Sequence, residues 1–169
     1  AAKDAVITAV EKNPESFDAN FSAGQILSRT GLNSKQVLPY YKKAVEIEPS
    51  NSKVLRELAG TYYDLGEKEE SVTIFKNAIS NESDKIVKAD LYFNLGVIYS
   101  QMCDYEESEK AFDEAFFLNE EDFEAALGMA RSYEGLGDNY LNGGEGCGGT
   151  FEKDSEKAAR WYRKAEKKI

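Results

Sequence analysis

Hydrophobic residues recur along the chain at the spacing of an α-helix. Leu55, Leu58, Ala59 and Tyr62 occupy positions i, i+3, i+4 and i+7, which lie on one side of a helix. The same order of large and small residues returns twice, at Leu95, Gly96 and Tyr99 and at Met129, Ala130 and Tyr133. Each of these stretches therefore predicts a helix that buries one face.

A second kind of helix alternates with the first. Its marker is a small residue, Ala44, which recurs 34 residues later as Ala78 and a further 37 later as Ala115. A bulky residue stands three positions before each marker, at Tyr41, Phe75 and Phe112. Gly31 and Gly66, 35 residues apart, mark the ends of helices of the first kind, because glycine is common just past a helix. The shared period predicts helix pairs repeated along the chain.

These residues resemble the tetratricopeptide repeat, with its Leu-Gly-x-x-Tyr helix, its Ala-x-x-x-Phe helix and a closing proline, here Pro14 and Pro49. The resemblance covers essentially the whole chain and implies an all-α fold, an α-solenoid of stacked antiparallel helix pairs wound into a superhelix. Residues 1–16 look like the second helix of a truncated repeat, on Ala2, Val6 and Ala9. The expected units are 17–51, 52–88, 89–122 and 123–169, with nine helices in all.

Three departures from the repeat change the expected elements. Pro39 lies within a predicted second helix, which should begin near Leu38 or be kinked. About three extra residues before the third unit should lengthen a helix or loop.

The last unit exceeds one period by some 16 residues, and its ends, Leu136-Gly137 and Trp161-Tyr162, resemble the Sel-like subclass of the repeat. Five of the eleven residues in 142–152 are glycine, which favours a mobile insertion over a phosphate or metal site.

Composition narrows the classes of function. The chain has 31 acidic and 21 basic residues, a net charge of −10, which disfavours nucleic acid as a partner. No apolar run approaches the roughly 18 residues of a membrane span. Histidine is absent and no catalytic constellation is visible, so we expect no enzyme, no cofactor and no metal. The start lacks methionine, so the native protein is expected to extend beyond residue 1, and no compartment is assigned.

The two cysteines, Cys103 and Cys147, are too few for a disulfide scaffold. Both fall at predicted turns between helices, which share one edge of a stack. A bridge is therefore possible, but free thiols are the expectation.

The resemblance also implies a binding surface, because tetratricopeptide repeats line a concave groove with a second stripe of their first helices. The residues expected there are Phe21, Gln25, Lys53, Arg56, Tyr63, Phe93, Asn94, Val97, Leu127 and Arg131. Several are apolar on a face that should meet water, which favours a binding role. The alternative is that they support neighbouring helices. Only Asn94 fits the Lys/Asn clamp of chaperone-binding members, so a clamp for a C-terminal carboxylate is not expected.

The leading hypothesis is a protein–protein interaction module that binds a partner peptide or helix in its groove. The alternative is structural: self-association into a homo-oligomer, or packing within a larger multi-repeat protein. An enzyme with a site in the glycine-rich insertion is the weakest hypothesis.

Overall fold

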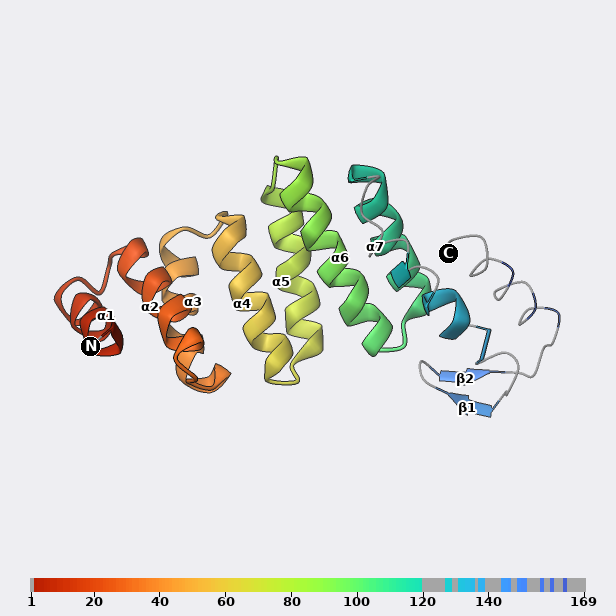
Figure 1. Cartoon of the computed structure of the whole chain (residues 1–169), viewed down its shortest axis with the longest axis horizontal. Coiled ribbons are helices and arrows are strands. Elements are labelled where there is room, and N and C mark those ends of the chain that lie inside the picture. The colour runs from red at the N-terminus through yellow and green to blue at the C-terminus, as the bar shows by residue number, and fades with distance from the viewer. Residues whose placement is uncertain are drawn as a thin grey trace. The chain divides into compact units, whose positions relative to one another are not determined.

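The computed structural model describes residues 2–119, 127–128, 131–135, 137–138, 144–146, 149–151, 156, 159 and 163. The chain divides into two compact units, residues 1–82 and 83–169. We treat each unit separately (Figure 1).

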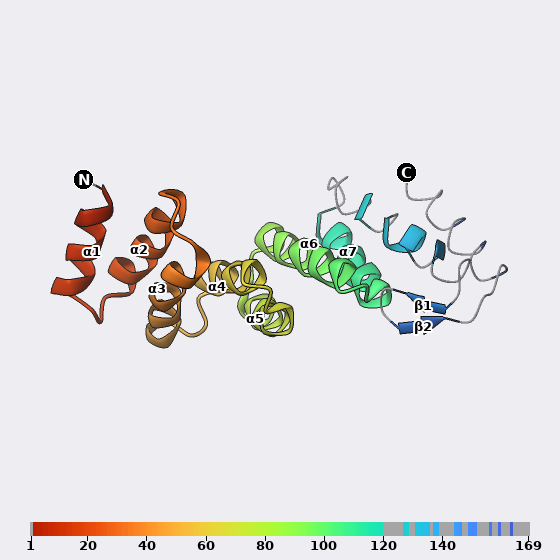
Figure 2. The same ribbon diagram turned by 90° about the horizontal axis from the view of Figure 1, so that it is seen from below.

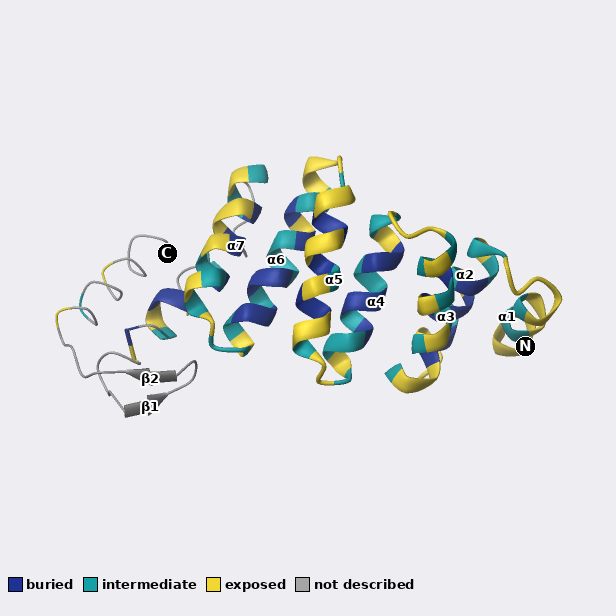
Figure 3. Cartoon of the chain, turned by 180° about the vertical axis from the view of Figure 1, so that it is seen from behind, coloured by how far each residue is buried: buried dark blue, intermediate teal, exposed yellow. Residues whose placement is uncertain are grey.

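The first unit contains five helices, each packed against the next along the chain. Their bounds are α1 Ala2–Lys12, α2 Phe17–Arg29, α3 Ser34–Ile47, α4 Ser52–Asp64 and α5 Lys68–Asn81. Ala23, Leu27, Tyr41, Ala44 and Leu58 belong to the buried core, which α2, α3 and α4 build together. In Figure 3 the outward face of α5 is exposed while its inward face is buried.

Helix α1 covers one side of this core through Val6, Ile7 and Val10, none of which is fully buried. Ala2 and Ala9, which the sequence placed on the packing face, are exposed instead. Helix α1 therefore packs through a different face from the predicted one. The larger side chains on this face bury more apolar surface.

The turns within the helix pairs share one geometry. Gly31 and Gly66 adopt positive φ angles of 86° and 83° just past α2 and α4, as predicted. After Gly66, the Glu67 amide donates to the Tyr62 carbonyl at 3.0 Å and closes the turn. Cys103 takes the same place after α6 with a φ of 64°, although it is not glycine. The Asp104 amide then donates to the Tyr99 carbonyl at 2.9 Å.

The expected start of α3 near Leu38 is wrong. The helix begins at Ser34 and continues through Pro39. Asn33 and Gln36 form a capping box, which fixes the start one turn earlier. Pro39 is exposed and sits early in the helix, so its ring meets solvent and only one backbone hydrogen bond is lost.

The second unit contains α6 (Lys85–Gln101) and α7 (Tyr105–Leu118), which pack against each other. The extra residues before the third repeat lengthen α6 to 17 residues, with Asp84 as its N-cap. Asp104 caps α7, because its side chain accepts a hydrogen bond from the Glu107 amide. Residues 127–128, 131–135 and 137–138 are also helical. Most other residues of the two last predicted helices lie outside the described part.

Two short strands, β1 Gly144–Gly146 and β2 Gly149–Phe151, form an antiparallel hairpin within the glycine-rich segment (Figure 2). The sequence did not predict this pairing, and the expected mobility of the segment stays a prediction. The predicted class, an α-solenoid of antiparallel helix pairs, is confirmed, with the hairpin as an addition. The Sel-like motif lies largely outside the described residues, and its assignment stays a prediction.

Candidate functional site

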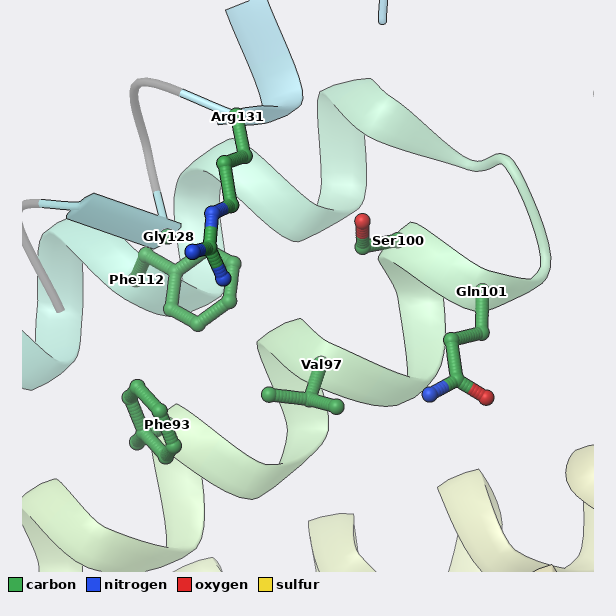
Figure 4. Close-up of a pocket in the computed structure, with 7 residues that line it drawn as sticks. All are labelled: Phe93, Val97, Ser100, Gln101, Phe112, Gly128 and Arg131. Atoms are coloured by element: carbon green, nitrogen blue, oxygen red, sulfur yellow. The ribbon is translucent and has the colours of Figure 1, made fainter. Parts of the chain in front are cut away.

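A pocket in the second unit brings together three of the residues predicted to bind a partner. Phe93 and Val97 come from α6, one turn apart, and Arg131 comes from the helical residues 131–135. The pocket has a volume of about 210 Å³ (Figure 4). We call it the α6 pocket, and its lining residues are Phe93, Val97, Ser100, Gln101, Phe112, Gly128 and Arg131.

Phe112 of α7 forms the base of the α6 pocket. Its side chain is only 3% exposed, and its ring centroid lies 5.5 Å from that of Phe93. The ring fits between two glycines: a Cβ would stand 2.8 Å from the ring at Gly96 and 2.6 Å from it at Gly128. No side chain could occupy either position without moving the ring, so the two glycines hold Phe112 in place.

A buried polar seam supports this base. The Ser108 hydroxyl of α7 donates to the Gly96 carbonyl at 2.8 Å, and it lies 2.8 Å from the hydroxyl of Ser132. The Ser132 hydroxyl also lies 3.1 Å from the Gly128 carbonyl. Both serines are completely buried. The seam ties together the helices that carry the two glycines, which fixes the width of the slot for Phe112.

The same contact occurs in the first unit, where the Ser71 hydroxyl donates to the Ala59 carbonyl at 2.7 Å. Ser71 and Ser108 are 37 residues apart, and each donates a hydrogen bond to the carbonyl of the small residue in the helix that precedes it. This repeated serine was not predicted, because a lone serine in an amphipathic helix has no distinctive pattern.

Tyr133 completes the supporting layer beside Phe112, with which it forms one buried cluster. Its hydroxyl donates to a Glu109 carboxylate oxygen at 2.6 Å. Burial raises the pKa of Tyr133 well above its usual value, and the hydrogen bond to the Glu109 carboxylate raises it further. The tyrosine therefore stays neutral and keeps donating at physiological pH.

Arg131 supplies positive charge at the edge of the pocket. Its side chain is exposed and extends toward the Phe112 ring (Figure 4). The ion pairs found within the described residues join other groups, and none involves Arg131. The guanidinium therefore borders an apolar pocket in a chain with a net charge of −10.

Two further predicted residues of this unit lie outside the pocket lining. The Asn94 side chain donates to the Asp90 carbonyl of its own helix at 2.7 Å, so it stabilises α6 locally. Leu127 is half-buried next to Gly128. Four lining residues, Ser100, Gln101, Phe112 and Gly128, are not in the expected set, and Phe112 was predicted only as the bulky residue of the second helix.

The predicted residues of the first unit are not gathered in the α6 pocket. Phe21 is half-buried and stacks on Phe17 at 5.5 Å, packing against the core as the alternative reading held. The Arg56 guanidinium lies 3.4 Å from the Glu57 carboxylate. The other three, Gln25, Lys53 and Tyr63, range from half-buried to exposed. A binding role for these residues stays a prediction.

A second pocket, of about 250 Å³, lies in the first unit and is lined by Tyr62, Glu69, Glu70, Thr73 and Ile74. The Lys42 ammonium of α3 lies 5.6 Å from the centroid of the Tyr62 ring. A hydrogen bond to Tyr62 raises the pKa of Lys42. The chain thus already places a cation of its own beside this pocket.

The expectation of a free thiol at Cys103 is wrong, because this cysteine is disulfide-bonded. It lies in the tight turn between α6 and α7. The chain has one other cysteine, Cys147, which lies outside the described residues.

Within the described residues, no cluster of acidic, cysteine or histidine side chains is arranged to hold a metal ion. None of the helices in this part of the chain is long and apolar enough to cross a membrane.

Comparison with protein families identifies the repeat. Models of the tetratricopeptide repeat match residues 1–52 and residues 89–122. The chain belongs to the tetratricopeptide repeat family. A comparison with curated protein sequences finds no significant match.

Several solved structures share the fold at low sequence identity. MamA superposes with a TM-score of 0.73 at 19% identity, covering 98% of this chain and 85% of MamA. A tetratricopeptide repeat protein from Parabacteroides merdae superposes with a TM-score of 0.72 at 20% identity, over 98% of this chain and 58% of that one. YrrB, described as a TPR protein with an unusual peptide-binding site, gives 0.64 at 19% identity, covering 99% and 93% of the two chains.

Proposed function

We propose that this protein is an interaction module that holds a segment of a partner protein in the α6 pocket. The observation that carries the proposal is the juxtaposition of half-buried Phe93 and Val97 with the exposed Arg131 around one cavity. Aromatic residues and arginine are the types most enriched among residues that dominate binding energy. Family membership supports the proposal, because tetratricopeptide repeat proteins generally bind proteins without catalysis.

The geometry favours a protein segment over a free small molecule. A volume of about 210 Å³ is below the roughly 300–1,000 Å³ of typical small-molecule sites and suits one bulky side chain. YrrB, a protein of similar fold, is described as having a peptide-binding site, which supports a peptide as the ligand here.

The proposal is tested by selecting peptides from a randomised display library on the immobilised protein and measuring their affinity by calorimetry. Phe93→Ala should weaken binding by about 5- to 150-fold, the effect of losing about 1–3 kcal/mol at an anchor residue. The matched control is Phe117→Ala, because Phe117 is 75% exposed on α7 and lies outside the pocket.

Circular dichroism should show that Phe93→Ala remains folded before its affinity is interpreted. Full affinity in folded Phe93→Ala, with a loss in Phe117→Ala, would contradict the α6 pocket and indicate the outer face of α7 instead. The self-association alternative is tested separately by sedimentation: a mass that rises with concentration would favour it.

A further inference from the structure

The charged side chain at the edge of the α6 pocket affects which ligands the pocket can bind. Arg131 is exposed at this edge, and none of the ion pairs within the described residues involves it. Glu134, one turn further along the same helical segment, is exposed as well and makes no ion pair there. The guanidinium is therefore available to a group that arrives with the ligand.

A ligand that fills the pocket removes water from one side of the guanidinium. An uncharged ligand leaves this loss uncompensated, whereas a carboxylate restores it through charge-assisted hydrogen bonds that guanidinium can make in pairs. A ligand with an ammonium group would be repelled. The difference gives the pocket a preference for negative charge even though the whole chain carries −10.

The apolar walls set the second requirement. Phe93 and Val97 lie on one face of α6, and Phe112 closes the base, fixed between Gly96 and Gly128. These side chains can contact a phenyl or branched aliphatic group from three sides. In Figure 4 the Arg131 side chain extends toward the Phe112 ring, so the carboxylate must lie within a few bonds of the apolar group.

We infer that the α6 pocket recognises a bulky apolar side chain with a carboxylate beside it, on a peptide segment of a partner protein. This inference rests on the proposed function and specifies its ligand. The carboxylate is that of an aspartate or glutamate next to the apolar residue, because the Lys/Asn pattern that grips a C-terminal carboxylate in chaperone-binding members is not present in this chain.

Three probes that share one ring and differ only in their end group test the inference: hydrocinnamate, the corresponding alcohol and the corresponding amine. Each is titrated into the folded protein while the methyl resonances of Val97 are followed by NMR. Hydrocinnamate should bind about 5- to 10-fold more tightly than the alcohol, as expected for one charge-assisted hydrogen-bonded pair. The amine should bind more weakly than the alcohol.

In Arg131→Gln the three affinities should agree within about twofold. Lys110→Gln is the matched control, because it removes one positive charge from an exposed site on α7 outside the pocket. This variant should keep the wild-type order.

Equal binding of all three probes to wild type at Val97 would overturn the inference and leave the proposed pocket intact. Absence of any shift at Val97 would overturn both. Paired peptides ending in phenylalanine as a free acid or an amide, each with or without a preceding glutamate, test the source of the carboxylate: the glutamate should tighten binding with either end group, and dependence on the free acid alone would overturn this assignment.

Discussion

Replacing Gly96 by alanine tests how firmly the α6 pocket is built. The new methyl would stand 2.8 Å from the Phe112 ring, whereas ordinary contact begins at 3.4 Å. The ring cannot retreat, because Gly128 closes its other side with equally little room. Overpacking of this kind costs about 1–3 kcal/mol, and alanine recovers up to about 1 kcal/mol through its higher helix propensity. The net expectation is a loss of about 0–2 kcal/mol.

Gly60→Ala is the matched control. Gly60 lies inside α4, and a Cβ built there meets nothing within 4 Å. This variant should therefore gain about 0.5–1 kcal/mol from helix propensity alone. The difference in unfolding free energy between the two variants isolates the packing cost at Phe112, about 1–3 kcal/mol.

The two variants are compared by urea unfolding followed by circular dichroism. Repeat arrays need not unfold in one step, so amide hydrogen exchange should assign each change to its helices. Gly96→Ala should speed exchange in α6 and α7, and Gly60→Ala should slow it in α4. Equal stabilisation by both substitutions would refute the view that two glycines hold Phe112 in place.

Three further predictions follow from the described contacts. Ser108→Ala should cost about 1–2 kcal/mol in urea unfolding and Ser71→Ala about 1 kcal/mol, because Ser108 has two buried partners and Ser71 one; equal costs would contradict the seam. The pKa of Tyr133 is raised in the folded chain, so above a pH of about 10 the unfolded chain releases a proton that the folded chain keeps. Stability should therefore fall as pH rises through this range. Tyr133→Phe should reduce this fall, and an unchanged slope would contradict the prediction. Cys103 should resist alkylation in the unfolded, unreduced protein and react after reduction; labelling before reduction, seen by mass spectrometry, would contradict the disulfide.

The fold was predictable because its signals are local and repeated. Leu58, Ala59 and Tyr62 lie on one helical face, and equivalent residues recur in the other repeats. Gly66 ends its helix because the turn needs a positive φ, which glycine adopts readily. The predicted start of α3 was wrong because it considered only the tendency of proline to break a helix. The capping box at Asn33 outweighs that penalty and starts the helix before Pro39.

The site was predictable only in part. Phe93, Val97 and Arg131 were identified by their positions in the repeat, and the structure places them around one cavity. The role of Phe112 depends on Gly96 and Gly128, which come from different helices and meet only in the folded unit. A burial pattern marks Phe112 as core but cannot show that the same ring also forms the base of a pocket.

The disulfide at Cys103 and the β1–β2 hairpin could not be predicted from the sequence either. Two cysteines far apart in sequence give no measure of their separation in space, and a glycine-rich stretch encodes little preference for strand pairing.

Site-specific photo-cross-linking tests the central claim most directly. A benzophenone amino acid is placed at Val97 in the α6 pocket or, as the control, at Thr73, which is exposed on α5. A labelled peptide selected for binding is then irradiated with each protein. The account predicts a cross-linked product with the probe at residue 97, competed away by unlabelled peptide, and none with the probe at residue 73. Capture at residue 73 without capture at residue 97 would contradict binding in the α6 pocket.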